Sequence, residues 1–286
     1  MKLIDKQRDL DRICLELQSE SVIAVDTEFE RRTTYFARLS IIQITTKRNE
    51  TIIIDALSGI NLNPLDQILR NKEILKILHS PEQDFEIFYH LFNHLPLNIF
   101  DTQLAAKICN IGIDLISYSN LCQQLLGIQI DKSLQQANWL VRPLGHKLLE
   151  YAARDTEFLI PLYELLLEKL NTTGKLTEYQ NELSRILDIN NYKVSIDKLI
   201  RKMRILDRSK SFESKVYTLT DFREECARIL DIPRSHFATD HDLLRLCHIL
   251  PTSDQELRKL RLERRRILDR RFKNKLFELC KGLKEL

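Results

Sequence analysis

The apolar residues of the first hundred positions fall in short β-branched runs separated by polar turns. Residues 21–26, 39–45 and 51–55 form the first three runs and predict three strands, which their short connections make antiparallel. Residues 74–79 and 97–100 predict two further strands. Strands that alternate with helical segments from this point on are typical of an α/β domain built on a mixed sheet.

Between and after these strands, apolar residues recur at intervals of three or four and predict helices. Four helices are expected at residues 82–92, 102–109, 114–126 and 175–189, and a single long one at 145–170. No strand pattern follows, so the rest of the chain is expected to be helical as well.

This change of pattern divides the chain into an α/β domain at 1–170, a helical connector at 171–209 and a small all-helical domain at 210–286. Residues 1–170 carry 18 Lys and Arg against 23 Asp and Glu, whereas residues 171–286 carry 26 against 18. An acidic part that could concentrate metal ions is thus followed by a basic part that could attract phosphate. Ordinary variation between two solvated surfaces explains the charges equally well.

The composition excludes several classes of protein. Apolar residues make up 43% of the chain, but no run approaches the roughly 20 apolar residues of a membrane span. The first residues are charged and contain no apolar signal segment. The six cysteines are dispersed without a C-x-x-C pair, which argues against a zinc site or a disulfide framework and fits a reducing compartment. We therefore expect a globular protein of the cytoplasm without membrane contact.

Two acids lie at the end of the first predicted strand, in the run VIAVDTEFE. Because successive strand residues point to opposite faces, Asp26 and Glu28 project to the same side. Two neighbouring anions at a buried strand end are costly unless a cation neutralises them, and carboxylate oxygens favour Mg²⁺ or Mn²⁺. A strand that runs out into solvent is the more common explanation of a lone D-x-E pattern.

Further candidate residues lie on predicted helices. Asp84 falls in the first turns of a helix that follows a strand, where the sites of α/β proteins gather. Tyr151 and Asp155 are four residues apart, so the phenol and the carboxylate share one face of the long helix. The signal of Asp84 is weak alone, because helix starts commonly carry acids. Taken alone, Tyr151 and Asp155 are better explained as a core tyrosine and an exposed aspartate. Together with the strand pair, these acids could surround two metal ions about 3.5–4 Å apart and support in-line displacement at phosphorus, with Tyr151 orienting the attacking water.

The full set of five is the signature of the DEDD exonucleases whose third motif is Y-x-x-x-D: Asp26, Glu28, Asp84, Tyr151 and Asp155. The segments DTEFERRTTYFARLSIIQ, LHSPEQDFEIF, DKSLQQANWLVRPL and EYAARDTEFLIPLY resemble the ribonuclease D family in order and spacing. The resemblance implies a ribonuclease H-like fold and metal-dependent 3′→5′ removal of nucleotides from RNA as nucleoside 5′-monophosphates. It implies two divalent ions, Mg²⁺ or Mn²⁺, as cofactors. It also implies single-stranded RNA 3′ ends and tRNA precursors as substrates, a role in tRNA 3′-end maturation, and no obligate protein partner.

The resemblance further implies roles for single residues. The four acids of the signature match metal ligands, and the tyrosine matches a catalytic position. Phe29, Lys132 and Gln135 match positions that contact the terminal nucleotide. Trp139 and Arg142 are expected to brace the loop that precedes the third motif.

The stretch YTLTDFREECARILDIPRSHFATDHDLLRLCHILPTSDQEL resembles the helicase-and-RNase-D C-terminal (HRDC) domain. The resemblance implies that residues 210–286 help to grip nucleic acid. The family usually carries two such domains in tandem, whereas this chain has about one. The basic segment 261–275 suits phosphate contacts. Its apolar positions keep a helical period, so a packed helix with a solvated basic face is an equal alternative.

Two other functions are weighed against the same candidate residues. A DNA exonuclease could have the same metal site, because discrimination between sugars depends on 2′-OH contacts that the sequence does not display. A non-catalytic RNA-binding module is expected to lack one of the acids or the tyrosine, and all five are present. The stretch at 130–144 and the HRDC-like tail favour RNA over DNA.

Overall fold

The computed structural model describes residues 1–112, 115–203, 205–207, 209–264, 266 and 269–285. The chain forms two compact units. The first unit contains Met1–Glu30 and Arg38–Tyr192, and the second contains Arg31–Ala37 and Lys193–Leu286. The chain therefore passes between the units three times, because the short loop 31–37 belongs to the second unit.

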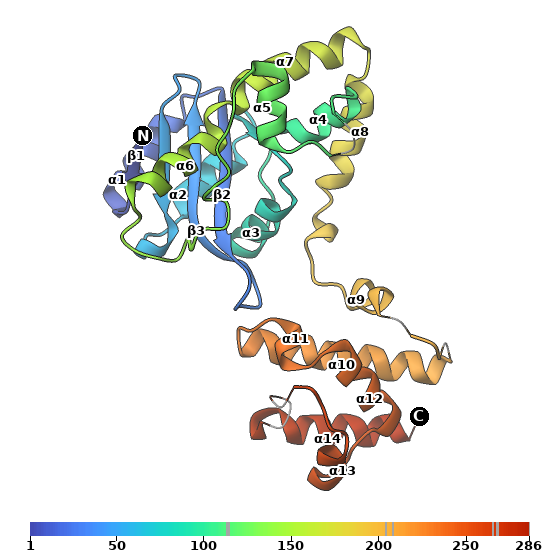
Figure 1. Cartoon of the computed structure of the whole chain (residues 1–286). Coiled ribbons are helices and arrows are strands. Elements are labelled where there is room, and N and C mark those ends of the chain that lie inside the picture. Colours follow the sequence, from blue (N-terminus) through green and yellow to red (C-terminus); the bar gives the residue numbers. More distant parts are fainter. Residues whose placement is uncertain (113–114, 204, 208, 265, 267–268, 286) are drawn as a thin grey trace. The chain divides into compact units, whose positions relative to one another are not determined.

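A six-stranded mixed sheet lies at the centre of the first unit (Figure 1). Its strands are β1 (Lys2–Ile4), β2 (Val22–Glu30), β3 (Arg38–Thr46), β4 (Thr51–Asp55), β5 (Leu75–Leu78) and β6 (Ile99–Asp101), in the order β1-β4-β3-β2-β5-β6. Strand β3 is antiparallel to β2 and β4, as predicted, and the other pairs are parallel. All five predicted strands are present. Strand β1 was not predicted, because it is too short to show a pattern.

Helices surround this sheet. They are α1 (Gln7–Leu17), α2 (Asn63–Arg70), α3 (Glu82–Phe92), α4 (Thr102–Ile108), α5 (Tyr118–Leu126), α6 (His146–Glu157), α7 (Leu159–Thr172) and α8 (Leu176–Ile186). Helix α6 crosses one face of the sheet over β4, β3 and β2 (Figure 1). Every residue of β4 is buried, so both faces of the sheet are covered there. Helices α1 and α2 were not predicted, and position 114, where one predicted helix begins, lies outside the described residues.

The prediction of a single helix at 145–170 is wrong, because α6 and α7 are separate helices that meet at Phe158. Pro161 lies in the first turn of α7. A proline there cannot donate a hydrogen bond to the carbonyl of Glu157, and its ring displaces that carbonyl. The apolar period continues across the break, so the period alone could not reveal it. The break gives α6, which carries the third motif, a direction of its own.

The second unit is helical, in agreement with the predicted pattern. Its helices are α9 (Ile196–Lys202), α10 (Lys210–Ile229), α11 (Arg234–Phe237), α12 (Asp240–Ile249), α13 (Asp254–Lys259) and α14 (Arg270–Lys284). Phe212, Leu219, Phe237 and Leu276 are among the buried residues of its core. Among the helices of either unit, within the described ranges, none is long and apolar enough to cross a membrane.

The connection between β2 and β3 is held by this second unit. Tyr35 packs against its hydrophobic core. The Tyr35 hydroxyl donates to Glu224 Oε2 at 2.8 Å, and the Tyr35 N–H donates to Asp231 Oδ1 at 3.1 Å. Glu224 is itself buried and forms ion pairs with Arg223 and Arg234. A loop of one unit's strand pair is thus bound into the charged network of the other unit, which no local sequence pattern predicted.

Candidate active site

Three of the predicted acids meet beside the second half of β2. Asp26 and Glu28 lie on this strand, and Asp155 lies on α6, which crosses it. One carboxylate oxygen from each lies within 4.8 Å of the other two. All three side chains are partly buried. This spacing allows the three carboxylates to share one bound cation.

Asp84 reaches the same end of the sheet from α3. Strand β5 runs parallel to β2 and ends at Leu78, so α3 begins near the edge to which β2 points. The Thr27 hydroxyl donates a hydrogen bond to the carboxylate of Asp84, a residue that is only 6% exposed. Thr27 therefore ties the second motif to the first. Thr27 was not predicted to be a site residue, although a hydroxyl between the two acids of D-x-E was a signal for it.

Burial raises the pKa of each acid in this group, and repulsion from neighbouring acids of the group adds to this for Asp26 and Glu28. Burial, and then the charges of Asp84 and Asp155, raise the pKa of Asp26 well above its usual range. Burial, and then the same two charges, raise the pKa of Glu28 to about 9. Burial raises the pKa of Asp155 to about 7. It also raises the pKa of Asp84 to about 7, against the lowering effect of the hydrogen bond from Thr27. Carboxylates packed in this way suit a multivalent cation, which relieves their repulsion.

Tyr151 lies one turn before Asp155 on the same face of α6. Its ring packs against the buried Trp139, with ring centroids 6.2 Å apart. Burial, and then the charges of Asp155 and Glu28, raise the pKa of Tyr151 above its usual value. The phenol therefore remains protonated at neutral pH, and it can orient a water molecule by hydrogen bonding.

The loop that precedes α6 is tied to the sheet by Arg142. Its guanidinium donates to both carboxylate oxygens of Asp55, each at 2.7 Å. It also donates to the Trp139 carbonyl at 2.8 Å and to the Ser40 carbonyl at 3.2 Å. These contacts give Arg142 the bracing role that was expected of it, and they fix the backbone of the residue that packs on Tyr151.

Residues 1–171 match the family model of the 3′-5′ exonuclease domain. The ribonuclease D of Gluconacetobacter diazotrophicus is 34% identical over 260 residues, which are 91% of this chain and 66% of that protein. The ribonuclease D of Sphingobium indicum is 32% identical over 260 residues, which are 91% of this chain and 67% of that protein. The chain belongs to the ribonuclease D family.

A solved structure of the ribonuclease D family supports this assignment. Escherichia coli RNase D, an exoribonuclease involved in structured RNA processing, has a TM-score of 0.89 and 27% identity to this chain. The match covers 99% of this chain and 75% of the E. coli chain. The predicted fold class, an α/β exonuclease domain followed by a helical region, is therefore confirmed. This chain spans about two thirds of the length of the two ribonuclease D relatives above.

The three residues of this chain that are expected to contact substrate lie in two places. Phe29 is on β2, directly after a bulge that follows the acidic pair. Lys132 and Gln135 lie in one exposed turn, where the Gln135 N–H donates to the Lys132 carbonyl at 3.2 Å. The Lys132 ammonium is 3.3 Å from the Ser117 hydroxyl. The structure thus brings the lysine and the glutamine together, and their described contacts lie outside the acidic group.

Of two other polar residues near the ribonuclease D motifs, Gln43 is buried and His79 is partly buried. Gln43 pairs with Asp26 across β2 and β3, and neither atom of its amide has a hydrogen-bond partner among the described residues. A buried amide beside the acids is available to a bound water or ligand. His79 follows β5, where its ring nitrogens contact the Thr102 hydroxyl and the Ile116 carbonyl at 3.0 and 3.1 Å. Burial lowers the pKa of His79 to about 4, so the ring is neutral and has a structural role.

The basic segment 261–275 of the helical unit is partly neutralised within that unit. Its ion pairs include Arg271–Asp269, Lys273–Asp254 and Lys275–Glu225. Three of the cations expected to contact phosphate therefore already have acidic partners, which favours the packed helix for this part of the segment. Positions 265, 267 and 268 lie outside the described residues.

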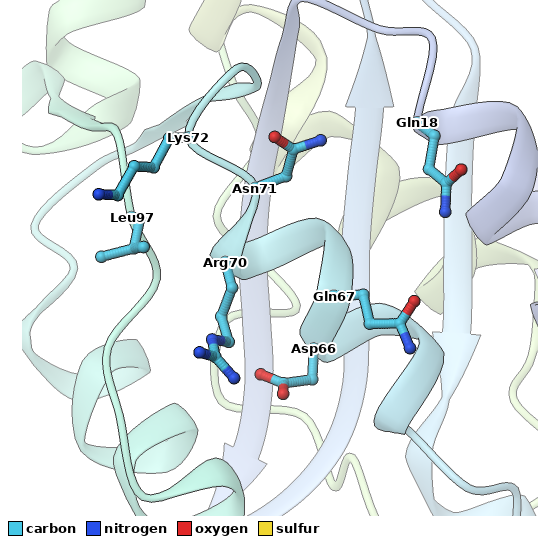
Figure 2. A pocket seen from close by; sticks show the side chains of 7 residues that line it. All are labelled: Gln18, Asp66, Gln67, Arg70, Asn71, Lys72 and Leu97. Atoms are coloured by element: carbon cyan, nitrogen blue, oxygen red, sulfur yellow. The ribbon is translucent and has the colours of Figure 1, made fainter.

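An open pocket lies elsewhere on the first unit (Figure 2). It is lined by the end of α1, by α2 and by residues that precede β5 and β6, including Arg70, Lys72 and Leu97. Asp84 follows β5 at its other end. The pocket and the acids therefore lie at opposite ends of this strand, and the pocket is not part of the candidate site.

Proposed function

We propose that this chain removes nucleotides one at a time from the 3′ ends of RNA and releases nucleoside 5′-monophosphates. The four proposed metal ligands are Asp26, Glu28, Asp84 and Asp155. The proposal is carried by the convergence of three carboxylates within 4.8 Å of one another in a chain whose first 171 residues match the 3′-5′ exonuclease domain. Every donor is a carboxylate oxygen, and this donor set suits two hard divalent cations such as Mg²⁺ or Mn²⁺.

The remaining roles belong to the protein's own side chains. When bound, the ions supply an activated water and stabilise the departing 3′ oxygen. The protonated Tyr151 orients that water for in-line attack, and Trp139 holds the tyrosine ring from one side. Phe29 contacts the terminal nucleotide from the strand that carries the first motif. Lys132 and Gln135 contact the same nucleotide from their exposed turn.

The proposed substrates are single-stranded RNA 3′ ends, including those of tRNA precursors. Support comes from the ribonuclease D relatives and from the structural likeness to the E. coli exoribonuclease, which acts in structured RNA processing. Residues 210–286 are proposed to be an HRDC-like domain that grips the RNA, with 171–209 as connector. The excess of positive charge in residues 171–286 supports this role. The six buried free thiols suit the reducing cytoplasm as the site of action, and no obligate protein partner is invoked.

The test is a time course on a 3′-tailed, tRNA-like RNA labelled at its 5′ end, with Mg²⁺, with Mn²⁺ and with EDTA. We expect a ladder that shortens from the 3′ end only when metal is present, with nucleoside 5′-monophosphates as the product. Equal shortening in EDTA, or none with either metal, contradicts the proposal. A DNA oligonucleotide of matched sequence is the second arm, and faster degradation of the DNA contradicts the assignment of RNA as substrate.

A further inference from the structure

The Tyr118 hydroxyl forms hydrogen bonds with two backbone groups where α6 meets α7. Tyr118 is the first residue of α5, which lies beside this junction (Figure 1). Its hydroxyl donates to the Arg154 carbonyl at 2.8 Å and accepts from the Phe158 N–H at 3.1 Å. In a continuous α-helix, the N–H of residue 158 donates directly to the carbonyl of residue 154. One phenol therefore bridges the two ends of a single opened helical turn.

The proposed metal ligand Asp155 lies inside this bridged turn, between Arg154 and Phe158. The turn is also held from the side of the sheet, because the buried Thr156 hydroxyl is 2.7 Å from the hydroxyl of Thr45 on β3. A turn fixed from both sides gives the carboxylate between its ends a defined direction, towards the other acids.

Pro161 accounts for the break in the helix but not for its geometry. The proline prevents a regular bond to the carbonyl of Glu157, and the chain then bends without a fixed angle. The opened turn leaves the Arg154 carbonyl and the Phe158 N–H without their regular bond to each other, and within the turn the N–H reaches the Thr156 carbonyl instead. A phenol can donate and accept at the same time, so the Tyr118 hydroxyl serves both groups and sets their separation.

We infer that Tyr118 is a positioning residue, whose hydroxyl fixes the turn that presents Asp155 to the metal ions. The inference rests on the proposed metal site and adds to it a residue of α5 that belongs to none of the three motifs. The Tyr118 hydroxyl bonds to the backbone on both sides of Asp155, and its effect passes through these two groups. Supporting residues of this kind change metal affinity by about 10–100-fold.

The test uses Tyr118→Phe in the full chain, because this change removes the hydroxyl and keeps the ring. Mn²⁺ is titrated into the protein without RNA by isothermal calorimetry, and exchange of the Phe158 amide is followed by NMR. We expect the Kd for Mn²⁺ to rise about tenfold or more and the Phe158 amide to exchange faster. Tyr192→Phe is the matched control, since it removes a hydroxyl that donates to the Ile186 carbonyl at 2.8 Å. The control is expected to bind Mn²⁺ like the unmodified protein.

Each contrary outcome has a separate meaning. If Tyr118→Phe binds Mn²⁺ like the unmodified protein, the inference is overturned even if the variant is less stable. If the control loses as much affinity as Tyr118→Phe, general loosening explains the effect and the inference is also overturned. If the unmodified chain binds no Mn²⁺, the proposed metal site itself is wrong and the inference falls with it.

Discussion

Arg142 holds Asp55 with two parallel hydrogen bonds, in which Nε and Nη2 each lie 2.7 Å from a carboxylate oxygen. Asp55 ends β4, and the same side chain accepts a hydrogen bond from the N–H of Leu57 in the following turn. Arg142 belongs to the loop that contains Trp139, whose ring packs on Tyr151. The ion pair therefore connects the rigid sheet to the surroundings of the proposed catalytic tyrosine.

Replacement of Arg142 by lysine is expected to destabilise the first unit, because lysine keeps the charge but cannot form the paired hydrogen bonds. The Arg142 side chain is 26% exposed, so we expect a loss of about 1–3 kcal/mol in the free energy of unfolding, below the range for fully buried pairs. Trp139 is the single tryptophan of the chain, and its fluorescence during urea unfolding reports on this region.

The control for this measurement is Arg12→Lys. Arg12 forms an exposed ion pair with Asp9, and its side chain is 64% exposed. Its replacement is expected to change the free energy of unfolding by less than about 0.5 kcal/mol. Equal unfolding midpoints for Arg142→Lys and the unmodified protein would show that the paired hydrogen bonds do not hold the loop.

Asp155→Asn is expected to abolish hydrolysis and, at the same time, to stabilise the metal-free protein. Burial raises the pKa of Asp155 to about 7, so at pH 8 its negative charge destabilises the folded state, and the neutral amide is expected to raise the free energy of unfolding in EDTA by at least about 1 kcal/mol. Thermal unfolding in EDTA and gel assays of RNA cleavage and binding measure both effects. RNA binding should remain largely intact.

Glu150→Gln is the control on the same helix, because Glu150 is exposed and pairs with His146 outside the acidic group. It should leave both the cleavage rate and the unfolding temperature in EDTA nearly unchanged. Persistent cleavage by Asp155→Asn would mean that the metal site has been misassigned.

Tyr151→Phe is expected to lower the turnover number by about 10–100-fold, because the attacking water loses the group that orients it. The variant keeps the ring that packs on Trp139, so the Mn²⁺ concentration at half-maximal rate should change little. Single-turnover cleavage over a series of Mn²⁺ concentrations measures both quantities. Tyr89→Phe on α3 serves as the control, and an unaltered rate in Tyr151→Phe would remove the tyrosine from the mechanism.

His79 should make the first unit sensitive to acid. Burial lowers its pKa from 6.5 to about 4, so the folded protein disfavours the protonated ring. Its contribution to stability is fully present above about pH 6.5 and is lost as the pH falls towards 4, up to about 3 kcal/mol in all. Urea unfolding between pH 4 and 7 should therefore show a steeper loss in the unmodified protein than in His79→Gln. Parallel profiles would contradict this assignment.

Local patterns predicted much of the first unit, because they express the geometry of single elements. The alternation of strand residues placed Asp26 and Glu28 on one side, and helical spacing placed Tyr151 and Asp155 on one face. In the structure, Asp26, Glu28 and Asp155 meet. The strands were predicted because runs of β-branched residues are buried on both faces of the sheet.

Contacts between distant residues could not be predicted in this way. The Tyr118 hydroxyl reaches a turn about 40 residues further along the chain, and no period or motif connects the two. The bond from Tyr35 to Glu224 spans an even longer stretch. Lys132 and Gln135 were assigned by resemblance alone, and the turn that contains them is exposed.

The loop that contains Tyr35 limits how the two units can be exchanged between proteins. A gene truncated after residue 192 would retain this loop but lose Glu224 and Asp231, to which it is bonded. A fragment that begins at residue 193 would in turn keep the buried Glu224 without the phenol that donates to it. Recombination at this boundary would therefore separate the loop from the two acids to which it is bonded. A new helical unit could replace the present one only if it also accepted the loop, so the two segments are expected to evolve together.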